Sequence, residues 1–388
     1  MIVDLHSHYP MHLLAGESDT VALMTHPARQ TLGDTFRAAV LRLANQVDNY
    51  QGKGGGPAVT IPSLAASNVR VALSVLYAPF DEVDLDLAYG APPRSGYIED
   101  VLKQIQSVEA EVRLQSDKAA VTHNHQELDA ALAAGTVALI HAVEGGFHLG
   151  DSESTVRDNV ARLAEQGVAY ITVAHLFYRQ VATNAPALPF LPDAVYATLF
   201  PQPRRGLTNL GVALITAMTE HHILVDVTHM SAPCIDETLQ LLDRLDPNGE
   251  VPVIATHSAC KTFSGAKYNL SDEHIAAIAR RNGVVGLIAC EHWMARGLPK
   301  PKTFEDTMAT IYRHIDHIHD VVKAPAGAHK FVAFGSDQDG FIKPALRGLE
   351  TPEGFTLVEA GITARYQEAA RDICSGNALR VLNYWKGR

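Results

Sequence analysis

The sequence predicts a (β/α)8 barrel, and two observations lead to that prediction. Eight short apolar runs recur along the 388 residues, separated by stretches with helical periodicity and helix-capping residues. Most of these runs end in a histidine or are directly followed by an acidic residue, at the edge where (β/α)8 barrels place their active sites. An open doubly wound sheet is the alternative, but that fold usually carries a glycine-rich phosphate turn after its first strand, which this sequence lacks.

Most of the eight apolar runs are rich in Val, Ile, Leu and Ala and lack the polar alternation of a half-exposed strand. This composition favours parallel strands that are buried on both faces. In chain order, the predicted strands are Ile2–His6, Val69–Tyr77, Val137–Val143, Ala169–His175, Ile223–His229, Pro252–His257, Val284–Ala289 and Phe331–Ser336.

Helices are predicted between the strands from apolar periodicity and from capping residues at their ends. Gly167 is a fitting residue to follow a helix end, and Ser271 begins a near-match to a capping box after the sixth strand. The other predicted helices are Thr31–Val47, Ile98–Ser116, Gln126–Ala134, Ser154–Gln166, Thr208–His221, Ala232–Leu245, Phe304–Val322, Val358–Cys374 and Asn377–Leu382.

Two predicted strands are followed by unusually long segments, at about 78–96 and 176–206. Loops of this length in a compact domain are usually functional, and in a barrel they would lie over the active-site face. The run Gly54–Gly56 follows no strand and is interpreted as a flexible loop. No domain boundary or internal repeat is evident, so residues 1–388 are predicted to form a single domain.

Composition excludes several classes of partner. The chain is 47% hydrophobic and carries a net charge of −11, which predicts a globular protein without the basic face that nucleic acid requires.

No apolar run approaches the roughly 20 residues of a membrane helix. The N-terminal residues lack a signal-peptide pattern. The four cysteines are scattered, so we expect reduced thiols in a cytoplasmic protein.

Metal-competent side chains gather at the predicted strand ends. His6 and His8 are two residues apart, so on an extended strand both imidazoles point the same way and can reach one cation. Placing titratable groups at the ends of buried strands is costly unless they are paired or ligated. Imidazole and carboxylate are ordinary zinc ligands. The remaining residues at this edge are Glu144, His175, His229, His257 and Asp337.

In these residues the sequence resembles the membrane (renal) dipeptidase family, peptidase family M19 of the amidohydrolase superfamily. The resemblance covers nearly the whole chain, in matching order and strand context. The segments that carry it are Asp4–His8, Val143–Gly146, Thr172–His175, Arg205–Gly211, Val225–Ser231, Pro252–Ser258, Gly335–Gly340 and Ser375–Val381.

The resemblance implies a pair of zinc ions in a TIM barrel hydrolase. Glu144 would bridge the two ions, with His6 and His8 holding one and His229 and His257 holding the other. A hydroxide shared by the metals would attack the amide carbonyl, because two metals acidify a bound water and polarise the substrate.

The resemblance also implies the roles of two further residues. Asp337 would take the proton from the attacking water and deliver it to the leaving amine. His175 would stabilise the developing oxyanion. The implied partner is a small-molecule substrate, a dipeptide or a related amide. A homodimer is compatible with the sequence, which carries no decisive interface signal.

The first departure from the family pattern lies at the metal site. The family usually has His-x-Asp at its first strand, whereas this chain has His6-Ser7-His8. A neutral ligand replaces an anion, so we expect weaker binding of the first metal or a different metal preference.

The second departure bears on the substrate. The family typically carries an arginine just before an asparagine to hold the substrate carboxylate, but here Tyr268 precedes Asn269, with Lys267 beside it. Tyrosine cannot give the bidentate contact that matches a carboxylate. These three residues are the candidate substrate contacts. A hydrolase of a non-dipeptide amide, lactam or ester is therefore the alternative function.

Several histidines lie away from the predicted site. His314, His317 and His319 fall in the middle of a predicted helix, where we expect solvated or capping roles. His123 and His125 lie where a helix leads into a strand, at the opposite face of the barrel, where structural roles are typical.

Overall fold

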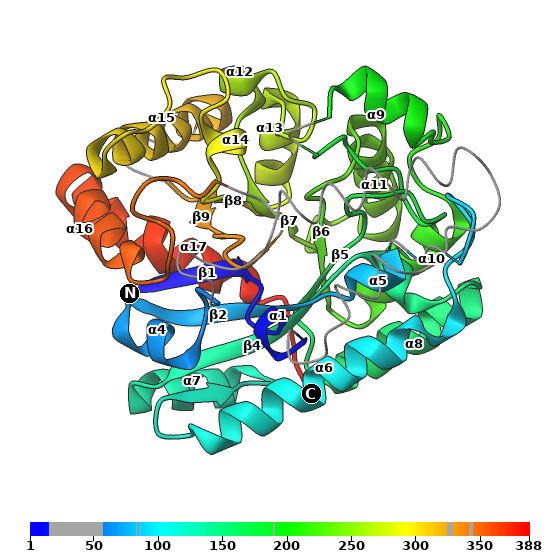
Figure 1. Ribbon diagram of the computed structural model, residues 1–388, viewed down its shortest axis with the longest axis horizontal. Helices are drawn as coiled ribbons and strands as arrows, with labels where there is room; N and C mark the ends of the chain where they lie inside the picture. The colour runs from blue at the N-terminus through cyan, green and yellow to red at the C-terminus, as the bar shows by residue number, and fades with distance from the viewer. Residues whose placement is uncertain (15–56, 83, 85, 189–190, 324–328, 341–343) are drawn as a thin grey trace.

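The computed structural model describes residues 1–14, 57–82, 84, 86–188, 191–323, 329–340 and 344–388. Its centre is a closed barrel of eight parallel strands (Figure 1), which confirms the predicted fold class. The ring closes because β2 pairs with both β1 and β4 and β9 pairs with β1. All eight predicted strands are confirmed, as β1 (Ile2–Ser7), β2 (Val69–Leu76), β4 (Val137–Glu144), β5 (Tyr170–Thr172), β6 (Leu224–Asp226), β7 (Val253–Ser258), β8 (Val284–Leu287) and β9 (Val332–Phe334).

A ninth strand, β3 (Ala119–Val121), lies outside the ring and was not predicted. It pairs with the N-terminal half of β4, whose C-terminal end pairs with β5 instead. Its three residues are too few to show a periodicity in the sequence.

Helices surround the barrel, and the longer ones match the predictions closely. The predicted helix 31–47 and the run Gly54–Gly56 lie outside the described residues. The helices are α1 (Met11–Leu14), α4 (Ile61–Ala66), α5 (Pro79–Glu82), α6 (Ile98–Leu114), α7 (His125–Ala134), α8 (Glu153–Glu165), α9 (Asp193–Leu199), α10 (Asn209–Glu220), α11 (Ala232–Leu245), α12 (Lys261–Ser264), α13 (Asp272–Arg280), α14 (Glu291–Met294), α15 (Phe304–Val322), α16 (Gly354–Tyr366) and α17 (Asn377–Leu382).

One predicted helix has the wrong limits. The sequence predicted a helix over Val358–Cys374, but α16 begins earlier, at Gly354, and ends at Tyr366. The break comes at Gln367, whose φ of 47° lies in the left-handed region. The chain continues through a 3-10 turn and a π-helical turn at Asp372–Gly376 before α17.

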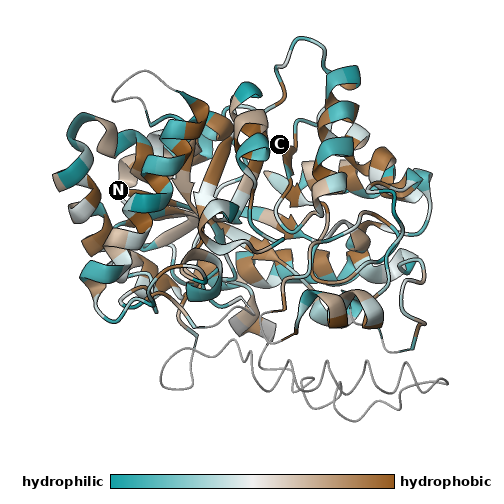
Figure 2. Cartoon of the chain, turned by 90° about the horizontal axis from the view of Figure 1, so that it is seen from above, coloured by the Kyte–Doolittle hydropathy of each residue, from teal (hydrophilic) through white to brown (hydrophobic). Residues whose placement is uncertain are grey.

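The core has two layers that follow the alternation of side chains along the strands. On β4, Ile140 and Ala142 pack inside the barrel, whereas Leu139 and Val143 pack against the surrounding helices. Figure 2 shows that many of the helices carry both hydrophilic and hydrophobic residues. The four cysteines are buried and form no disulfide. Within the described residues, no helix is long and apolar enough to span a membrane.

The described parts of the two long segments contact each other near the C-terminal ends of the strands. The segment 78–96 contains α5, and the segment 176–206 contains α9 (Figure 1). They are joined through Glu82, whose Oε1 accepts a hydrogen bond of 2.7 Å from the backbone N–H of Phe177. These segments therefore border the mouth of the barrel, where the candidate site lies.

Candidate metal centre

The structure brings seven of the predicted site residues together at the mouth of the barrel. Every one of them is at least 93% buried, with exposed fractions of at most 7%. They come from six of the eight barrel strands or from the residues directly after them. The seven are His6 and His8 at β1, Glu144 at the end of β4, His175 after β5, His229 after β6, His257 on β7 and Asp337 after β9.

Glu144 lies at the centre of this cluster. Neither of its carboxylate oxygens accepts a hydrogen bond, although the side chain is buried. A buried carboxylate without partners is costly, whereas a carboxylate that bridges cations is satisfied. Five imidazole Nε2 atoms surround it: those of His6 at 3.3 Å, His229 at 3.6 Å and His257 at 3.7 Å from Oε1, and those of His8 and His175 at 3.4 Å from Oε2.

The donor set fits metal ions. Ligand atoms of His6, His8 and Glu144 all lie within 4.8 Å of one another, and the same is true of Glu144, His175 and His229. The Nε2 atoms of His229 and His257 are only 2.9 Å apart. Such close approach of imidazole nitrogens around one carboxylate is typical of ligands that converge on cations.

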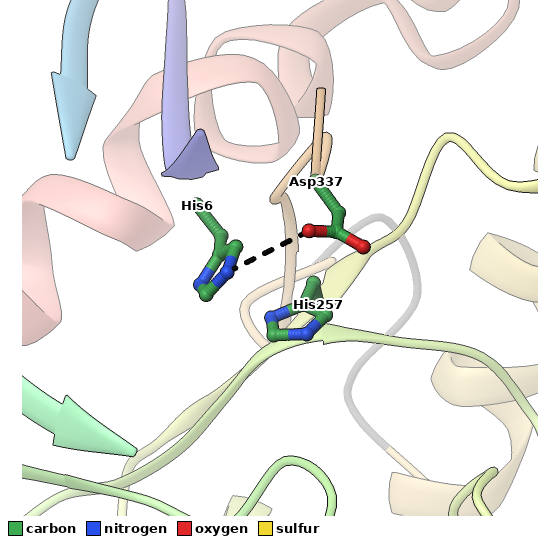
Figure 3. Close-up of side chains that lie close together, drawn as sticks. All are labelled: His6, His257 and Asp337. Atoms are coloured by element: carbon green, nitrogen blue, oxygen red, sulfur yellow. Dashed lines mark ion pairs between the residues drawn. The ribbon is translucent and has the colours of Figure 1, made fainter. Parts of the chain in front are cut away.

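Asp337 lies at the edge of the cluster. Its Oδ1 is 3.1 Å from Nε2 of His8 and 3.8 Å from Nε2 of His6. Figure 3 shows its carboxylate directed towards His6, with the ring of His257 close by. Asp337 and His229 have φ values of 56° and 64°, in the left-handed region. Such backbone strain costs about 1–3 kcal/mol and concentrates at functional sites.

A buried hydroxyl fixes the proton of His6. The hydroxyl of Tyr170 donates to the carbonyl of Leu5 at 2.9 Å, so it accepts from Nδ1 of His6 at 2.7 Å. A proton therefore resides on Nδ1, and Nε2 is the ring nitrogen that faces Glu144. Metal-ligating histidines are oriented in this way.

His175 is held by a second carboxylate. Its Nδ1 donates to Oε2 of Glu82 at 2.7 Å, and the hydroxyl of Tyr77 donates to the same oxygen at 2.6 Å. Burial alone would lower the pKa of His175, but the charges of Glu144 and Glu82 outweigh it and raise that pKa to about 9. The imidazolium form can donate a proton from Nε2.

Three other buried groups of the cluster, Glu144, His229 and His257, are held in the forms that bind cations. Burial raises the pKa of Glu144, but the charges of His175 and His6 lower it by more, so it stays well below its ordinary value. Burial and the charge of His175 lower the pKa of His229. Burial and the charge of His6 lower the pKa of His257. Glu144 is thus a carboxylate and these two histidines are neutral.

Asp226 supports the cluster from the next layer. Its Oδ2 accepts from the hydroxyls of Thr172 and Thr256 at 2.7 Å each, and its Oδ1 accepts from Thr228. The Thr256 hydroxyl in turn lies 3.0 Å from Nδ1 of His257. The predicted site set included neither Asp226 nor the partners of His6 and His175. The position of Asp226 on a predicted strand only weakly indicated a role in the site. Nothing in the sequence indicated one for Glu82.

The three predicted substrate contacts lie beside the cluster. The hydroxyl of Tyr268 donates to the carbonyl of His292 at 3.1 Å, and the amide of Asn269 donates to the carbonyl of Trp293 at 2.7 Å. Lys267 is largely exposed and lies 3.6 Å from Asp193. With His229, the three line a pocket of about 240 Å³.

The chain is similar to known proteins at the level of the family, the sequence and the fold. The family profile described as membrane dipeptidase (peptidase family M19) matches residues 2–386. An uncharacterized dipeptidase of Schizosaccharomyces pombe is 27% identical over 263 residues, which are 66% of this chain and 56% of that protein. Dipeptidase tcpJ of Claviceps purpurea is 24% identical over 289 residues, 73% of this chain and 59% of that protein. The matches thus span less than two thirds of these relatives.

Solved structures share the fold over the full chain. The dipeptidase AC, a metallopeptidase of family M19, has a TM-score of 0.70 and 19% identity, covering 100% of this chain and 99% of that chain. A metallopeptidase from Rhodobacter sphaeroides, solved with a phosphinate mimic of L-Ala-D-Ala, has a TM-score of 0.71 and 19% identity, covering 99% of each chain. At these identities, the likeness establishes the fold.

Proposed function

This chain belongs to the membrane dipeptidase family, peptidase family M19, and on that premise we propose that it is a zinc-dependent hydrolase cleaving the peptide bond of a dipeptide. One observation carries the proposal. Glu144 is a buried carboxylate with no hydrogen bond, and five imidazole Nε2 atoms lie within 3.7 Å of it. That arrangement is costly for a protein without cations and favourable for one that binds them.

The proposed ligands form two sets around Glu144. His6 and His8 would hold one zinc ion, His229 and His257 the other, and Glu144 would contact both. Bound there, two divalent cations would lower the pKa of a water and polarise the scissile carbonyl. The neutral His8 in place of an aspartate leaves this site less negative by one charge than the family pattern.

Two further residues would transfer protons and stabilise the charge that develops on the substrate. Asp337 would take a proton from the attacking water and pass it to the leaving amine, and the distance of 3.1 Å between its Oδ1 and Nε2 of His8 supports this role. His175 would donate from Nε2 to the carbonyl oxygen as negative charge develops there. Glu82 keeps its ring in place.

Metal content and dipeptide hydrolysis test this proposal together. We expect about two zinc ions per chain at the mouth, turnover of a panel of L-L and L-D dipeptides, and loss of turnover on chelation. Glu144→Gln should lose metal and at least about 100-fold in kcat/KM, since a shared ligand is removed. Glu99→Gln, on the exposed start of α6, is the matched control. Chelator-insensitive turnover would overturn the proposal.

A second candidate function, hydrolysis of another amide, a lactam or an ester, is favoured by Tyr268. Its ring packs against Trp293 at an interplanar angle of 38°, with centroids 4.5 Å apart, and its hydroxyl donates to a backbone carbonyl. Residue 268 itself therefore supplies no cation for a substrate carboxylate, although the side chain of Arg296 contacts its hydroxyl. The nearby Lys267 is an exposed point charge that is shared with Asp193.

Tyr268→Arg distinguishes the two candidates. If the natural substrate lacks a carboxylate here, the variant should gain about 10-fold or more in kcat/KM for dipeptides, as expected for a charge-assisted hydrogen bond. Turnover of N-acyl compounds and esters should not rise. Tyr268→Phe controls for loss of the hydroxyl. Efficient dipeptide turnover by the unaltered protein, with no gain in the variant, would exclude this second function.

A further inference from the structure

A second group of metal-competent side chains lies on the outer side of β4, away from the mouth. It consists of Glu109 on α6, His123 between β3 and α7, and His141 on β4. One ligand atom from each of the three lies within 4.8 Å of the others. His141 precedes Glu144 by three residues, so the alternation along the strand directs it outward, towards the helices.

His141 has no partner for its polar atoms. It is fully buried, and neither ring nitrogen makes a hydrogen bond. Burial, helped by the charges of His123 and Arg388, lowers its pKa to about 3, so the ring is neutral. Leaving a polar group buried and unpaired costs about 1–3 kcal/mol, and native proteins rarely tolerate it without a reason.

His123 is oriented as a metal-ligating histidine would be. Oε2 of Glu127 accepts from the backbone N–H of His123 at 2.8 Å and lies 2.9 Å from Nδ1. Nδ1 therefore carries a proton, and Nε2 faces Oε1 of Glu109 at 3.1 Å. If the His123 ring is neutral, its Nε2 and Oε1 of Glu109 present lone pairs to each other. A cation between them, or a second proton on His123, removes the conflict.

We propose that Glu109, His123 and His141 bind one divalent cation of the zinc class, at a site separate from the mouth of the barrel. Two neutral imidazoles and one carboxylate are a familiar zinc donor set, with a fourth position left for water. Glu109 is about a quarter exposed, at 23%, so a cation can enter from solvent. The ion would fasten α6 and the segment before α7 to β4.

No mouth residue takes part in this site, which would link α6 and the segment before α7 to β4. The proposal is independent of the hydrolase function. The competing arrangement is a metal-free His123 imidazolium paired with both Glu109 and Glu127. That arrangement leaves His141 without any partner, whereas a cation accounts for both histidines.

The test combines anomalous X-ray diffraction at the zinc edge with elemental analysis of the full-length protein purified with zinc. We expect an anomalous peak between Glu109, His123 and His141, in addition to any at the mouth. Glu109→Gln should lose one metal equivalent per chain relative to the unaltered protein while keeping turnover within about two-fold. Glu99→Gln, also on α6 and also salt-bridged, should lose none.

The opposite results would overturn the proposal. They are an absence of anomalous density at this position, or equal metal content in Glu109→Gln and the unaltered protein. The anomalous diffraction experiment needs no variant, so it tests for the cation even if a substitution impairs folding. Metal at this site with none at the mouth would sustain this inference and refute the proposed function.

Discussion

At the scale of single residues, the mouth of the barrel depends on groups that orient the histidines. An imidazole can present either nitrogen, and the nitrogen that faces a cation is fixed by what the other one contacts. For His6 that contact is the hydroxyl of Tyr170, and for His175 it is Glu82. These partners determine whether the cluster is preorganised for cations.

Tyr170→Phe should therefore weaken metal binding without touching a ligand. Nδ1 of His6 would keep only the longer 3.3 Å contact to the Thr256 hydroxyl. We expect a loss of about 10–100-fold in metal affinity, the usual effect of removing such a partner. The free energy of unfolding should fall by about 1–3 kcal/mol, because a buried donor loses its acceptor. Metal titration and urea unfolding measure the two effects.

Tyr384→Phe is the control for Tyr170→Phe. In the unaltered protein, the hydroxyl of Tyr384 also donates to a backbone carbonyl, that of Thr219, at 3.2 Å and far from the mouth. It should lower stability modestly and leave metal affinity unchanged. Equal metal affinities in both variants and the unaltered protein would show that Tyr170 does not orient His6.

The sequence could identify residues at strand ends but not their supporting partners. His6 and His8 were recognisable because a spacing of two puts both rings on one side of a strand. Tyr170 reaches His6 from β5, which is not a neighbour of β1 in the sheet. Such contacts across the barrel depend on side-chain reach in three dimensions, which no periodicity in the sequence records.

At the scale of elements, α15 shows where the sequence was informative and where it misled. Its limits, Phe304–Val322, were predicted correctly from apolar periodicity. The expectation of a solvated or capping role was wrong for His314, which is fully buried. Its Nδ1 accepts from the backbone of Cys260 at 3.1 Å, and its Nε2 donates to the carbonyl of Met294 at 2.9 Å. His314 thus joins α15 to the segments before α12 and at the end of α14.

This buried histidine should make stability depend on pH. Burial lowers the pKa of His314 from 6.5 to about 4. Below pH 6.5 the unfolded chain binds a proton here, whereas the folded chain does not until about pH 4. Acidification across that window should therefore remove about 3 kcal/mol of stability, at 1.36 kcal/mol per pKa unit. Above pH 6.5 both states are neutral and the effect disappears.

His314→Gln tests this pH dependence, because glutamine offers an acceptor and a donor but does not titrate. The variant should be less stable than the unaltered protein at pH 7.5, and the gap should narrow as the pH falls to 4.5. Urea unfolding at a series of pH values gives the comparison. A gap that stays constant with pH would mean that His314 titrates alike in both states.

At the scale of the whole molecule, the metal ligands come from strands that are distant in the sequence. His6 is on β1, Glu144 ends β4, and His257 is on β7, so cations at the mouth would connect one side of the barrel to the other. The fold itself was predictable, since each strand is a short apolar run followed by a helix. The second cluster on β4 was not, because Glu109, His123 and His141 carry no spacing that sets them apart.

Metal removal should therefore lower the stability of the whole barrel, because a cation that binds only the folded state stabilises it by mass action. At a free concentration 1,000-fold above Kd, one site adds about 4 kcal/mol. We expect the thermal midpoint to fall on chelation and to recover with added zinc. Glu144→Gln and Glu109→Gln should each abolish part of that response, and the double variant nearly all of it. A double variant that still responds like the unaltered protein would place the stabilising cations elsewhere, since neither cluster would then be their binding site.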